Sequence, residues 1–326
     1  MKTTEKKNIL VIGGAGFVGS NLVHRLVKEP HASITVLDSL DPVFKSTMDA
    51  LRPVAAAITF IQGDLRDEKL LRKLIPKADI IFNCAAQTSH PYSLENPVFD
   101  AEVNCIGNLR LLLAIRDGNP KATVVYTSSS TVVGKAVGDL IDESHGEKPL
   151  DIYSANKGVA EKYYRIFNRV YDLKTIVLRF ANLFGPYGKN DPAFGFVNYF
   201  IGQASEGRPI TLFGNGEQTR NVMYIEDAVD IMLQAPQHPE LYGEAYFATH
   251  HDHHSVKEIA EAITAEFGGS VSYVPWPDIR KRIEIERVRF SSSRLQKLTG
   301  WKARHSLKEG LRKTKQLMNE FAHAKK

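Results

Sequence analysis

The sequence predicts an α/β protein whose core is a doubly wound parallel sheet with helices on both faces. Short apolar runs alternate with amphipathic runs through the first 180 residues, which is the pattern of repeated strand–helix units. The first apolar run ends in a G-x-x-G-x-x-G turn, and small or acidic residues follow several later runs. Since the carboxyl ends of parallel strands meet at one edge of a sheet, these residues are expected to line a common ligand site.

The alternation places the strands and the helices between them. Strands are expected at residues 9–12, 34–37, 58–61, 80–84, 124–127 and 175–178. Helices are expected at residues 17–27, 68–74 with Asp67 as N-cap, 97–116 and 152–170. Residues 1–180 are therefore expected to form a nucleotide-binding domain.

After residue 180 the regular alternation stops. Residues 182–196 are rich in Gly, Pro, Asn and aromatic residues and are expected to form a loop. A strand at 222–225 and a helix at 226–234 are expected to return to the first domain, within a returning segment 221–248. Residues 181–220 and 249–326, which end in an amphipathic helix at 307–321, are expected to form a smaller α/β domain that binds the substrate.

The composition is that of a soluble globular protein and argues against several function classes. Hydrophobic residues make up 43% and charged residues 24% of the 326 positions, and no run reaches the roughly 20 apolar residues of a membrane span. The net charge of +5 is dispersed, which does not indicate a nucleic-acid-binding surface. The N-terminus lacks a signal-type apolar core, and Cys84 and Cys105 lie in elements expected to be buried, which indicates a cytoplasmic protein.

The glycine turn has the spacing and context of a dinucleotide-binding loop. Gly13 permits a backbone conformation that a side chain would forbid, Gly16 opens the backbone to a pyrophosphate, and Gly19 lets the helix pack close to the strand. The N-terminus of that helix offers free N–H groups and a partial positive charge. Asp38, nineteen residues after Gly19, stands where a carboxylate binds the adenosine ribose, although it could instead cap the next helix. No Arg or Lys follows Asp38 directly to receive a 2′-phosphate, which favours NAD over NADP.

Tyr153 and Lys157 form the pair to which we assign the chemistry. They stand four residues apart, so both lie on one face of the helix expected at 152–170. A tyrosine that acts as a base needs a pKa below its usual value of about 10, and an ammonium group one turn away is expected to lower it. A serine at the end of the neighbouring strand, within residues 128–130, can bridge the phenol and a substrate hydroxyl.

Taken together, the motifs resemble those of the extended short-chain dehydrogenase/reductase family, in particular its nucleotide-sugar epimerase/dehydratase group. The resemblance covers nearly the whole chain and rests on residues 13–19, Asp38, 63–65, 85–86, 128–134, Tyr153 with Lys157, 179–186 (RFANLFGP), 212–220 (LFGNGEQTR) and 224–227. It implies a Rossmann fold, a bound NAD and a nucleoside-diphosphate sugar as substrate. It also implies a homodimer formed through the helices at 98–116 and 152–170.

The resemblance further implies the residues of the site, with Ser129 as the catalytic serine beside Tyr153 and Lys157. The residues implied to bind NAD are Gly13, Gly16, Phe17, Val18, Gly19, Asp38, Asp64, Leu65, Ala85, Ala86, Gln87, Asn104, Tyr153 and Lys157. The residues implied to bind substrate are His90, Ser129, Ser130, Asn182, Arg220 and Arg287, of which Asn182 and the two arginines hold the diphosphate. Arg289 is the alternative to Arg287, and His90 is explained equally well by packing.

Ser130 and Thr131 distinguish between the subfamilies that the resemblance covers. Similar 4,6-dehydratases carry an Asp-Glu pair directly after the catalytic hydroxyl residue, and neither Ser130 nor Thr131 replaces a carboxyl group. This favours a 4-epimerase of a UDP-sugar, in which Tyr153 takes the 4-hydroxyl proton and the C4 hydride passes to NAD and returns to the other face. A dehydratase, ketoreductase or decarboxylase of the same family is the alternative, and a non-catalytic NAD-binding regulatory protein is the alternative of another class.

A few positions depart from the family pattern, and one histidine cluster invites a metal interpretation. Ile12, Val133 and Asn221 stand where the family usually has Thr, Tyr and Asp, and none of these positions is catalytic. Residues 250–254 read HHDHH, but no partner ligands are evident elsewhere in the chain. We therefore expect no metal.

Overall fold

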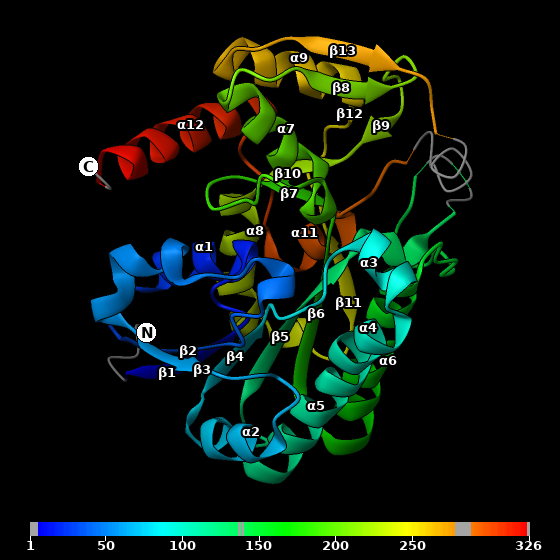
Figure 1. Cartoon of the computed structure of the whole chain (residues 1–326). Helices are drawn as coiled ribbons and strands as arrows, with labels where there is room; N and C mark the ends of the chain where they lie inside the picture. Colours follow the sequence, from blue (N-terminus) through cyan, green and yellow to red (C-terminus); the bar gives the residue numbers. More distant parts are fainter. Residues whose placement is uncertain (1–5, 136–137, 139, 278–287, 325–326) are drawn as a thin grey trace.

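The computed structural model describes residues 6–135, 138, 140–277 and 288–324, and its lower body is the predicted doubly wound parallel sheet (Figure 1). Seven parallel strands lie in the order β11-β6-β5-β4-β1-β2-β3. Their bounds are β1 Lys7–Ile12, β2 Ala32–Asp38, β3 Thr59–Gln62, β4 Ile80–Asn83, β5 Thr123–Ser129, β6 Lys174–Phe180 and β11 Ala245–Ala248. All six strands predicted from the alternation are in this sheet, whereas β11 was not predicted.

The strand order reverses between β1 and β4, and this reversal positions the site. From β1 the chain adds β2 and β3 on one side, then crosses to place β4 on the other side of β1, where Ile12 is opposite Asn83. The chain connections that follow the two strands run in opposite directions along the sheet, and this leaves a crevice beyond the carboxyl ends of the strands.

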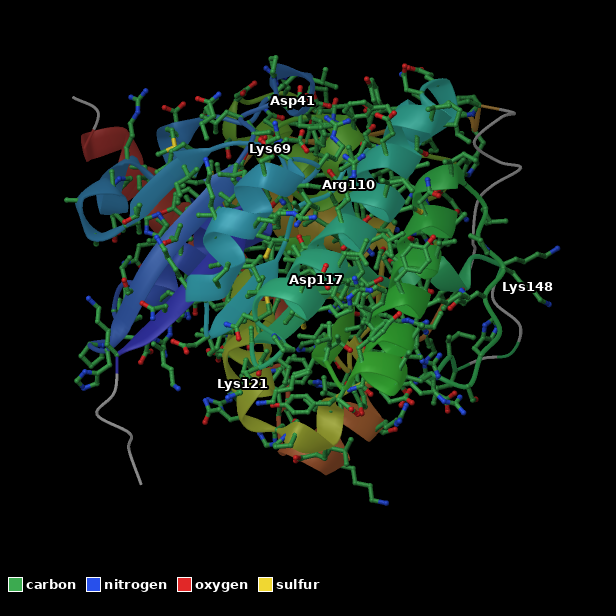
Figure 2. The ribbon with its side chains drawn as sticks, turned by 90° about the horizontal axis from the view of Figure 1, so that it is seen from below. Asp41, Lys69, Arg110, Asp117, Lys121 and Lys148 are labelled. Atoms are coloured by element: carbon green, nitrogen blue, oxygen red, sulfur yellow. The ribbon has the colours of Figure 1, made fainter. Side chains whose placement is uncertain are left out.

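Both faces of the sheet are buried, which explains why its strands read as continuous apolar runs. Along β1, Ile9 and Val11 join one core, which also includes residues of α1 (Phe17–Leu26) and α8 (Ile225–Gln234). Leu10 and Ile12 join the opposite core. That second face is covered by α2 (Glu68–Leu74), α5 (Gly107–Gly118) and α6 (Ile152–Tyr171), which lie side by side in Figure 2.

Several local predictions differ from the structure. No α-helix joins β2 to β3, because short 3-10 turns at Pro42–Phe44, Met48–Ala50 and Arg52–Ala57 fill that connection. The helix predicted at 97–116 is divided into α4 (Pro97–Ala101), a π-helical turn (Glu102–Ile106) and α5, and α3 (His90–Glu95) precedes it. The short strand β7 (Asn182–Phe184) forms within the predicted loop.

The segment at 221–248, which is predicted to return to the first domain, reaches the main sheet through a strand that was not predicted. The strand expected at 222–225 forms as β10 (Val222–Tyr224), which pairs with β7 and not with the main sheet. β11 is the strand that pairs with β6, while α8 packs on α1 as expected of a returning helix. A strand of three residues between two short loops carries too little pattern for its partner to be predicted.

The upper body of the molecule in Figure 1 is built mainly from the later part of the chain. It contains α7 (Phe196–Ser205), β8 (Ile210–Phe213), α9 (Val256–Phe267) and β13 (Val271–Val274), with β8 and β13 paired in parallel. β9 (Thr219–Arg220) and β12 (His254–Ser255) pair antiparallel, α11 (Ser293–Thr299) lies by β11, and α12 (Leu307–Ala324) packs on α9. The proposed division into two domains remains a prediction. Among the described residues, no helix combines the length and the apolar character needed to cross a membrane.

Candidate active site

The glycine turn after β1 is a position where only glycine fits the backbone. Gly13 has φ of 75°, and a Cβ there would lie 2.6 Å from the backbone nitrogen of Ala85, beyond β4. A Cβ on Gly19 would lie 2.2 Å from the carbonyl oxygen of Gly13. The glycine turn after β1 and the segment beyond β4 therefore lie so close at the reversal of strand order that no side chain fits between them. Gly16 is the N-cap of α1 and makes no side-chain cap, which leaves the N–H groups of that helix accessible to an anion.

Asp38 lies at the end of β2 beside this turn, with 7% of its surface exposed. One carboxylate oxygen accepts a hydrogen bond from the backbone nitrogen of Ala15 and the other from that of Leu40, both at 2.9 Å. Burial raises the pKa of Asp38, and these backbone hydrogen bonds oppose that rise. The carboxylate is therefore fixed in direction at the edge of the glycine turn.

A cavity of about 200 Å³ runs over the glycine turn and Asp38. It brings together most of the residues predicted to bind the cofactor, namely Gly13, Gly16, Phe17, Val18, Gly19, Asp38, Asp64, Leu65, Ala85 and Ala86. A glycine turn that admits no Cβ, an open helix N-terminus and a fixed carboxylate at the next strand end are the features that a dinucleotide requires. The residues present therefore fit NAD.

Two of the predicted cofactor residues that do not line that cavity, Gln87 and Asn104, lie in a buried polar network. The side-chain nitrogen of Gln87 donates to Asp100 at 2.6 Å, and that of Asn104 donates to the carbonyl of Gln87 at 2.9 Å. The side-chain oxygen of Asn104 is buried and has no hydrogen-bond partner among the described residues. It is an acceptor available to a ligand donor.

The carboxylate of Asp64 is used within the protein. It accepts hydrogen bonds from Arg66 at 2.8 and 3.0 Å, and Arg66 also reaches Glu102 at 3.1 Å. Burial acts to raise the pKa of Asp64, but the bonds and charge of Arg66 outweigh it and the pKa is lowered. A contact of Asp64 with the cofactor would therefore use its backbone, or the lone pairs of its carboxylate that Arg66 does not use.

Sequence reasoning missed a basic side chain near Asp38. Lys189, from the segment after β7, lines the same cavity, donates to the carbonyl of Phe44 and interacts electrostatically with Asp38. Next to it, Lys45 and Asp191 form an ion pair at 2.5 Å. No Lys or Arg directly follows Asp38 in the sequence, yet the fold supplies a lysine from about 150 positions away. No local motif marks such a residue.

Tyr153 and Lys157 lie on the buried face of α6, as predicted. The carboxylate of Asp151 caps this helix by accepting from the backbone nitrogen of Ser154 at 2.8 Å. Tyr153 is 8% exposed and shares a side-chain hydrogen bond with Ser129, at the end of β5. The ammonium of Lys157 donates to the carbonyl of Thr127 at 2.6 Å.

The serines at the end of β5 have different partners. The hydroxyl of Ser128 donates to Glu161, which is also paired with Arg179, so Ser128 belongs to the scaffold. Ser130 is buried. The hydroxyl of Ser129 lies 2.8 Å from that of Thr131 and bonds to Tyr153, which is the arrangement expected of the catalytic serine.

The prediction that Lys157 lowers the pKa of Tyr153 was wrong for the protein chain without bound ligands. Burial raises the pKa of Tyr153 above its usual value, against the hydrogen bond from Ser129, and it lowers the pKa of Lys157 to about 7. Desolvation outweighs the hydrogen bond of Ser129 at Tyr153 and the negative charge of Glu161 at Lys157, because both side chains are buried. Burial cannot be inferred from a spacing of four residues.

His90 stands directly beside Tyr153. Its Nδ1 lies 2.6 Å from a carboxylate oxygen of Asp151, and its ring meets the ring of Tyr153 edge-on with centroids 4.7 Å apart. The hydroxyl of Ser93 accepts from the backbone nitrogen of Tyr153 at 3.2 Å and donates to the carbonyl of His90 at 2.7 Å. The segment with His90 is thus tied to the start of α6.

The residues predicted to hold the diphosphate come from the segments around β7 and β9. The side chain of Asn182 donates to the carbonyl of Asn221 at 2.9 Å, and Arg220 in β9 donates to the carbonyl of Thr219 at 2.8 Å. Since Asn182 bonds to Asn221, which directly follows Arg220, the two predicted residues lie on adjoining segments of the fold. Arg287 lies outside the described residues, and the main chain of its alternative, Arg289, accepts from Ile141 at 2.8 Å.

The histidine cluster has structural contacts. Asn221 donates to the carbonyl of His250 at 2.7 Å, and Nε2 of His253 accepts from the backbone nitrogen of Phe290 at 3.0 Å. Candidate ligand atoms of His250, His251 and Asp252 lie within 4.8 Å of one another, but Nδ1 of His250 accepts from the backbone nitrogen of Asp252 at 3.0 Å. That no metal binds here remains a prediction.

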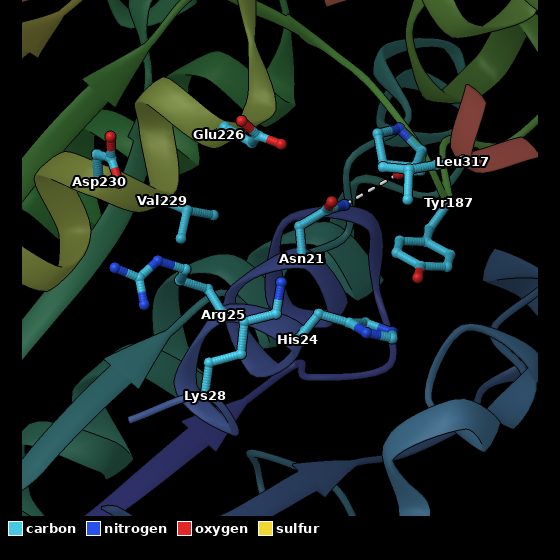
Figure 3. A pocket seen from close by; sticks show the side chains of 10 residues that line it. Asn21, His24, Arg25, Lys28, Tyr187, Glu226, Val229, Asp230 and Leu317 are labelled. Carbon is cyan, nitrogen blue, oxygen red and sulfur yellow. Dashed lines mark hydrogen bonds between the residues drawn. The ribbon is translucent and has the colours of Figure 1, made fainter. Parts of the chain in front are cut away.

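A larger cavity of about 340 Å³ lies between α1, α8 and the loop at 186–187 (Figure 3). Its lining residues are Asn21, His24, Arg25, Lys28, Pro186, Tyr187, Glu226, Val229, Asp230 and Leu317, none of them a predicted site residue. In Figure 3 the side chain of Asn21 donates to the carbonyl of Pro186, at 2.9 Å. Its volume does not make it the candidate active site, because none of the residues predicted to be catalytic, Ser129, Tyr153 and Lys157, lines it.

Comparison with known proteins agrees with this geometry. Residues 9–247 match the model of the NAD dependent epimerase/dehydratase family. The chain is 29% identical over 310 residues to a UDP-glucose 4-epimerase of Mycolicibacterium smegmatis, covering 94% of this chain and 96% of the relative. Other relatives are described as a UDP-N-acetyl-alpha-D-glucosaminuronate decarboxylase and as dTDP-D-glucose 4,6-dehydratases.

Solved structures extend the likeness to the whole fold. A UDP-glucose 4-epimerase of Thermotoga maritima, solved with UDP-glucose, has a TM-score of 0.87 at 25% identity, covering 97% of this chain and 99% of that one. A UDP-glucose 4-epimerase of Thermus thermophilus, solved with NAD, has a TM-score of 0.84 at 27% identity, with the same coverage. The cofactor of the group is NAD. The chain thus belongs to the NAD dependent epimerase/dehydratase family.

Proposed function

We propose that the protein is a 4-epimerase that inverts C4 of a nucleoside-diphosphate sugar, with a UDP-sugar as the preferred substrate. The observation that carries the proposal is the set of Ser129, Tyr153 and Lys157, at the carboxyl end of β5 and on the buried face of α6, without a carboxyl pair after the serine. Ser130 and Thr131 occupy those two positions. Relatives described as UDP-glucose 4-epimerases support the choice of reaction and nucleotide.

In this proposal the proton of the 4-hydroxyl passes to the phenolic oxygen of Tyr153, while Ser129 holds that hydroxyl in place. NAD, when bound, would supply the acceptor and the donor of the C4 hydride. Lys157 stabilises the phenolate with its positive charge, for which its amine must stay protonated, and burial opposes this by lowering its pKa to about 7. The 4-keto sugar would rotate within the pocket to present its other face, and Tyr153 would then return the proton to O4.

The turning step requires that the diphosphate be held while the sugar is released. Asn182, Arg220 and Arg287 are proposed for this role, because a guanidinium matches the oxygen pairs of a phosphate in two-point contact. Holding one end of the substrate leaves rotation about the diphosphate linkage as the motion that exposes the other face of the ketone.

The decisive experiment is a substrate panel without added reductant. The holoenzyme is incubated with UDP-, dTDP-, GDP- and CDP-linked sugars, and products are identified by NMR. Interconversion of C4 epimers is expected. A stable 4-keto-6-deoxy product would mean a dehydratase, release of CO₂ from a uronate a decarboxylase, and turnover only with added reductant a ketoreductase.

A non-catalytic NAD-binding protein is the alternative from a different class. A pure binder has no need of Ser129, Tyr153 and Lys157 as a connected set, which speaks against it. Inactivity toward every sugar of the panel, with NAD bound in full, would favour this alternative.

We further propose a cytoplasmic homodimer that forms through α6 and the helical segment at 98–116, which comprises α4, the π-helical turn and α5. Apolar side chains on the outer face of α6 are exposed, with Ile166 at 51% and Val170 at 60%. Light scattering after size-exclusion chromatography is expected to give twice the chain mass, and Val170→Asp to shift it toward the monomer. A monomer at all protein concentrations would contradict this arrangement.

A further inference from the structure

His90 and Asp151 form a hydrogen-bonded pair at the point where two helices begin. Asp151 is the N-cap of α6, and His90 is the first residue of α3. One carboxylate oxygen of Asp151 caps α6 through Ser154, and the other meets Nδ1 of His90 at 2.6 Å. Asp151 therefore aligns the imidazole relative to the helix that presents Tyr153.

The pairing fixes which nitrogen of His90 is basic. Burial acts to raise the pKa of Asp151, but the hydrogen bond and charge of His90 and the bond from Ser154 outweigh it, so the pKa is lowered. An ionised carboxylate only accepts hydrogen bonds, so Nδ1 carries the proton and Nε2 is the free base of the neutral ring. Nε2 has no hydrogen-bond partner within the part of the chain that the structure describes.

The position of His90 puts this base within reach of the substrate. Its ring centroid is 4.7 Å from that of Tyr153, the group that acts on O4, while its side chain is 42% exposed. A sugar ring with its substituents is wider than this separation, so the two side chains can contact neighbouring parts of one sugar. His90 is thus suited to the carbons beside C4, and its exposure lets a proton on it exchange with water.

We propose that His90, oriented by Asp151, is a second acid–base group of this site and exchanges a proton with a sugar carbon next to a C4 ketone. The hydrogens on these carbons become acidic when C4 is a ketone, and the chain has no carboxyl group at residues 130–131 to remove them. The proposal depends on the proposed function in one respect, namely that the site holds a nucleotide-linked sugar with a ketone at C4.

The step balances without a further reactant. Nε2 of His90 takes a proton from C3 or C5, the C–H electron pair becomes a double bond to C4, and the carbonyl pair moves to O4. The Tyr153 phenol, protonated after the first proton transfer, donates a hydrogen bond to that enolate oxygen. Reversal restores the ketone. Since His90 approaches from one side, the proton returns to the face it left, so the hydrogen exchanges and the configuration is retained.

The test uses the holoenzyme in D₂O with UDP-4-keto-6-deoxyglucose as the probe, so that no oxidation at C4 is needed. Proton NMR follows loss of the C3 and C5 signals against an enzyme-free sample. His90→Asn keeps an N–H donor to Asp151 and removes Nε2, and it is expected to slow the enzyme-dependent exchange by about 100-fold or more. His251→Asn, at a residue whose side chain is 74% exposed, is the matched control and is expected to change nothing.

Asp151 is a positioning residue, and its role is tested by the ratio of the hydrogen-exchange rate to the rate of C4 epimerisation. Asp151→Asn keeps a helix cap, because Asn caps as well as Asp, but it removes the charge. The rate of exchange is expected to fall at least about 10-fold relative to the rate of C4 epimerisation of UDP-glucose, whereas a loss of structure would lower both equally. His90→Gln serves as the second variant if His90→Asn does not fold, as judged by circular dichroism and NAD content.

The outcomes separate the two proposals. Exchange no faster than in the enzyme-free sample, or undiminished in the folded His90 variants, overturns the role of His90. Epimerisation of UDP-sugars without exchange overturns this inference alone, and exchange without epimerisation of any sugar overturns the proposed 4-epimerase function alone.

Discussion

The proposed site has an adenosine end and a sugar end, and the two are built in different ways. The adenosine end is made from strand-end residues in sequence order, with the glycine turn after β1, Asp38 at the end of β2 and Ala85 beyond β4 meeting at the reversal of the sheet. The sugar end is proposed to combine the segments around β7 and β9 with His90, Ser129 and Tyr153, whose mutual contacts appear only in the fold. Backbone shape dominates at the first end, and side-chain chemistry at the second.

A substitution at the sugar end is therefore expected to remove activity without removing the cofactor. Tyr153→Phe deletes the phenolic oxygen but keeps the ring, and it is expected to lower kcat by about 10² to 10⁴-fold. NAD content after gel filtration is expected to match that of the wild type. Unchanged turnover would rule out Tyr153 as the acid–base group, and loss of NAD would mean that the two ends are not separable.

The converse substitution at the adenosine end is expected to act through the backbone. In Gly19→Ala the new methyl group would lie 2.2 Å from the carbonyl oxygen of Gly13, which cannot move aside. The expected cost is about 1 to 3 kcal/mol of unfolding free energy, with loss of bound NAD. Thermal unfolding with and without NAD measures it.

Gly146→Ala is the matched control for this prediction, because a Cβ there meets no atom within 4 Å. It is expected to leave the melting temperature and the NAD content as they are. If both alanine variants had the same melting temperature and the same NAD content, the explanation that Gly19 is required because the backbone of Gly13 lies so close would be refuted.

A smaller effect is expected from Asp38→Asn. The carboxylate accepts from two backbone N–H groups, and an amide can keep only part of these contacts. NAD is expected to bind about 10-fold more weakly, which corresponds to about 1.4 kcal/mol. Asp49→Asn, at an exposed position, is the control, and calorimetric titration of cofactor-free protein is the measurement.

The smallest predicted effect lies away from both ends, at the N-cap of α2. Asp67 accepts from the backbone nitrogen of Leu70 at 3.0 Å. Asp67→Ala is expected to cost about 1 kcal/mol of stability and to leave NAD binding and kcat unaltered. Asp67→Asn retains a cap and should lie near the wild type in a denaturant titration. A larger loss in Asp67→Asn than in Asp67→Ala would contradict the capping role.

The contrast between the two ends also explains how much the sequence could reveal. The six strands and the glycine turn were predictable because apolar runs and Gly spacing are local and strictly required by the backbone. The pairing of β10 with β7 was not predicted, since a three-residue strand carries no signal for its partner. The approach of Lys189 to Asp38 and the pairing of His90 with Asp151 depend on tertiary packing, which no spacing encodes.

The pKa values at the sugar end show the same limit. The i, i+4 spacing of Tyr153 and Lys157 correctly placed both on one helix face, but it says nothing of desolvation. Burial raises the pKa of the tyrosine and lowers that of the lysine, opposite to the expectation from charge proximity alone. Side-chain chemistry follows from the environment, and the environment is a property of the fold.

The central claim is that the C4 hydride leaves and returns within one bound complex. Its most direct test uses UDP-galactose labelled with deuterium at C4, incubated with the holoenzyme in ordinary water and with unlabelled free NAD. The account predicts UDP-glucose that retains deuterium at C4, and no accumulation of free NADH. Loss of the label to water, its appearance in the free nicotinamide pool, or release of NADH with each turnover would contradict it.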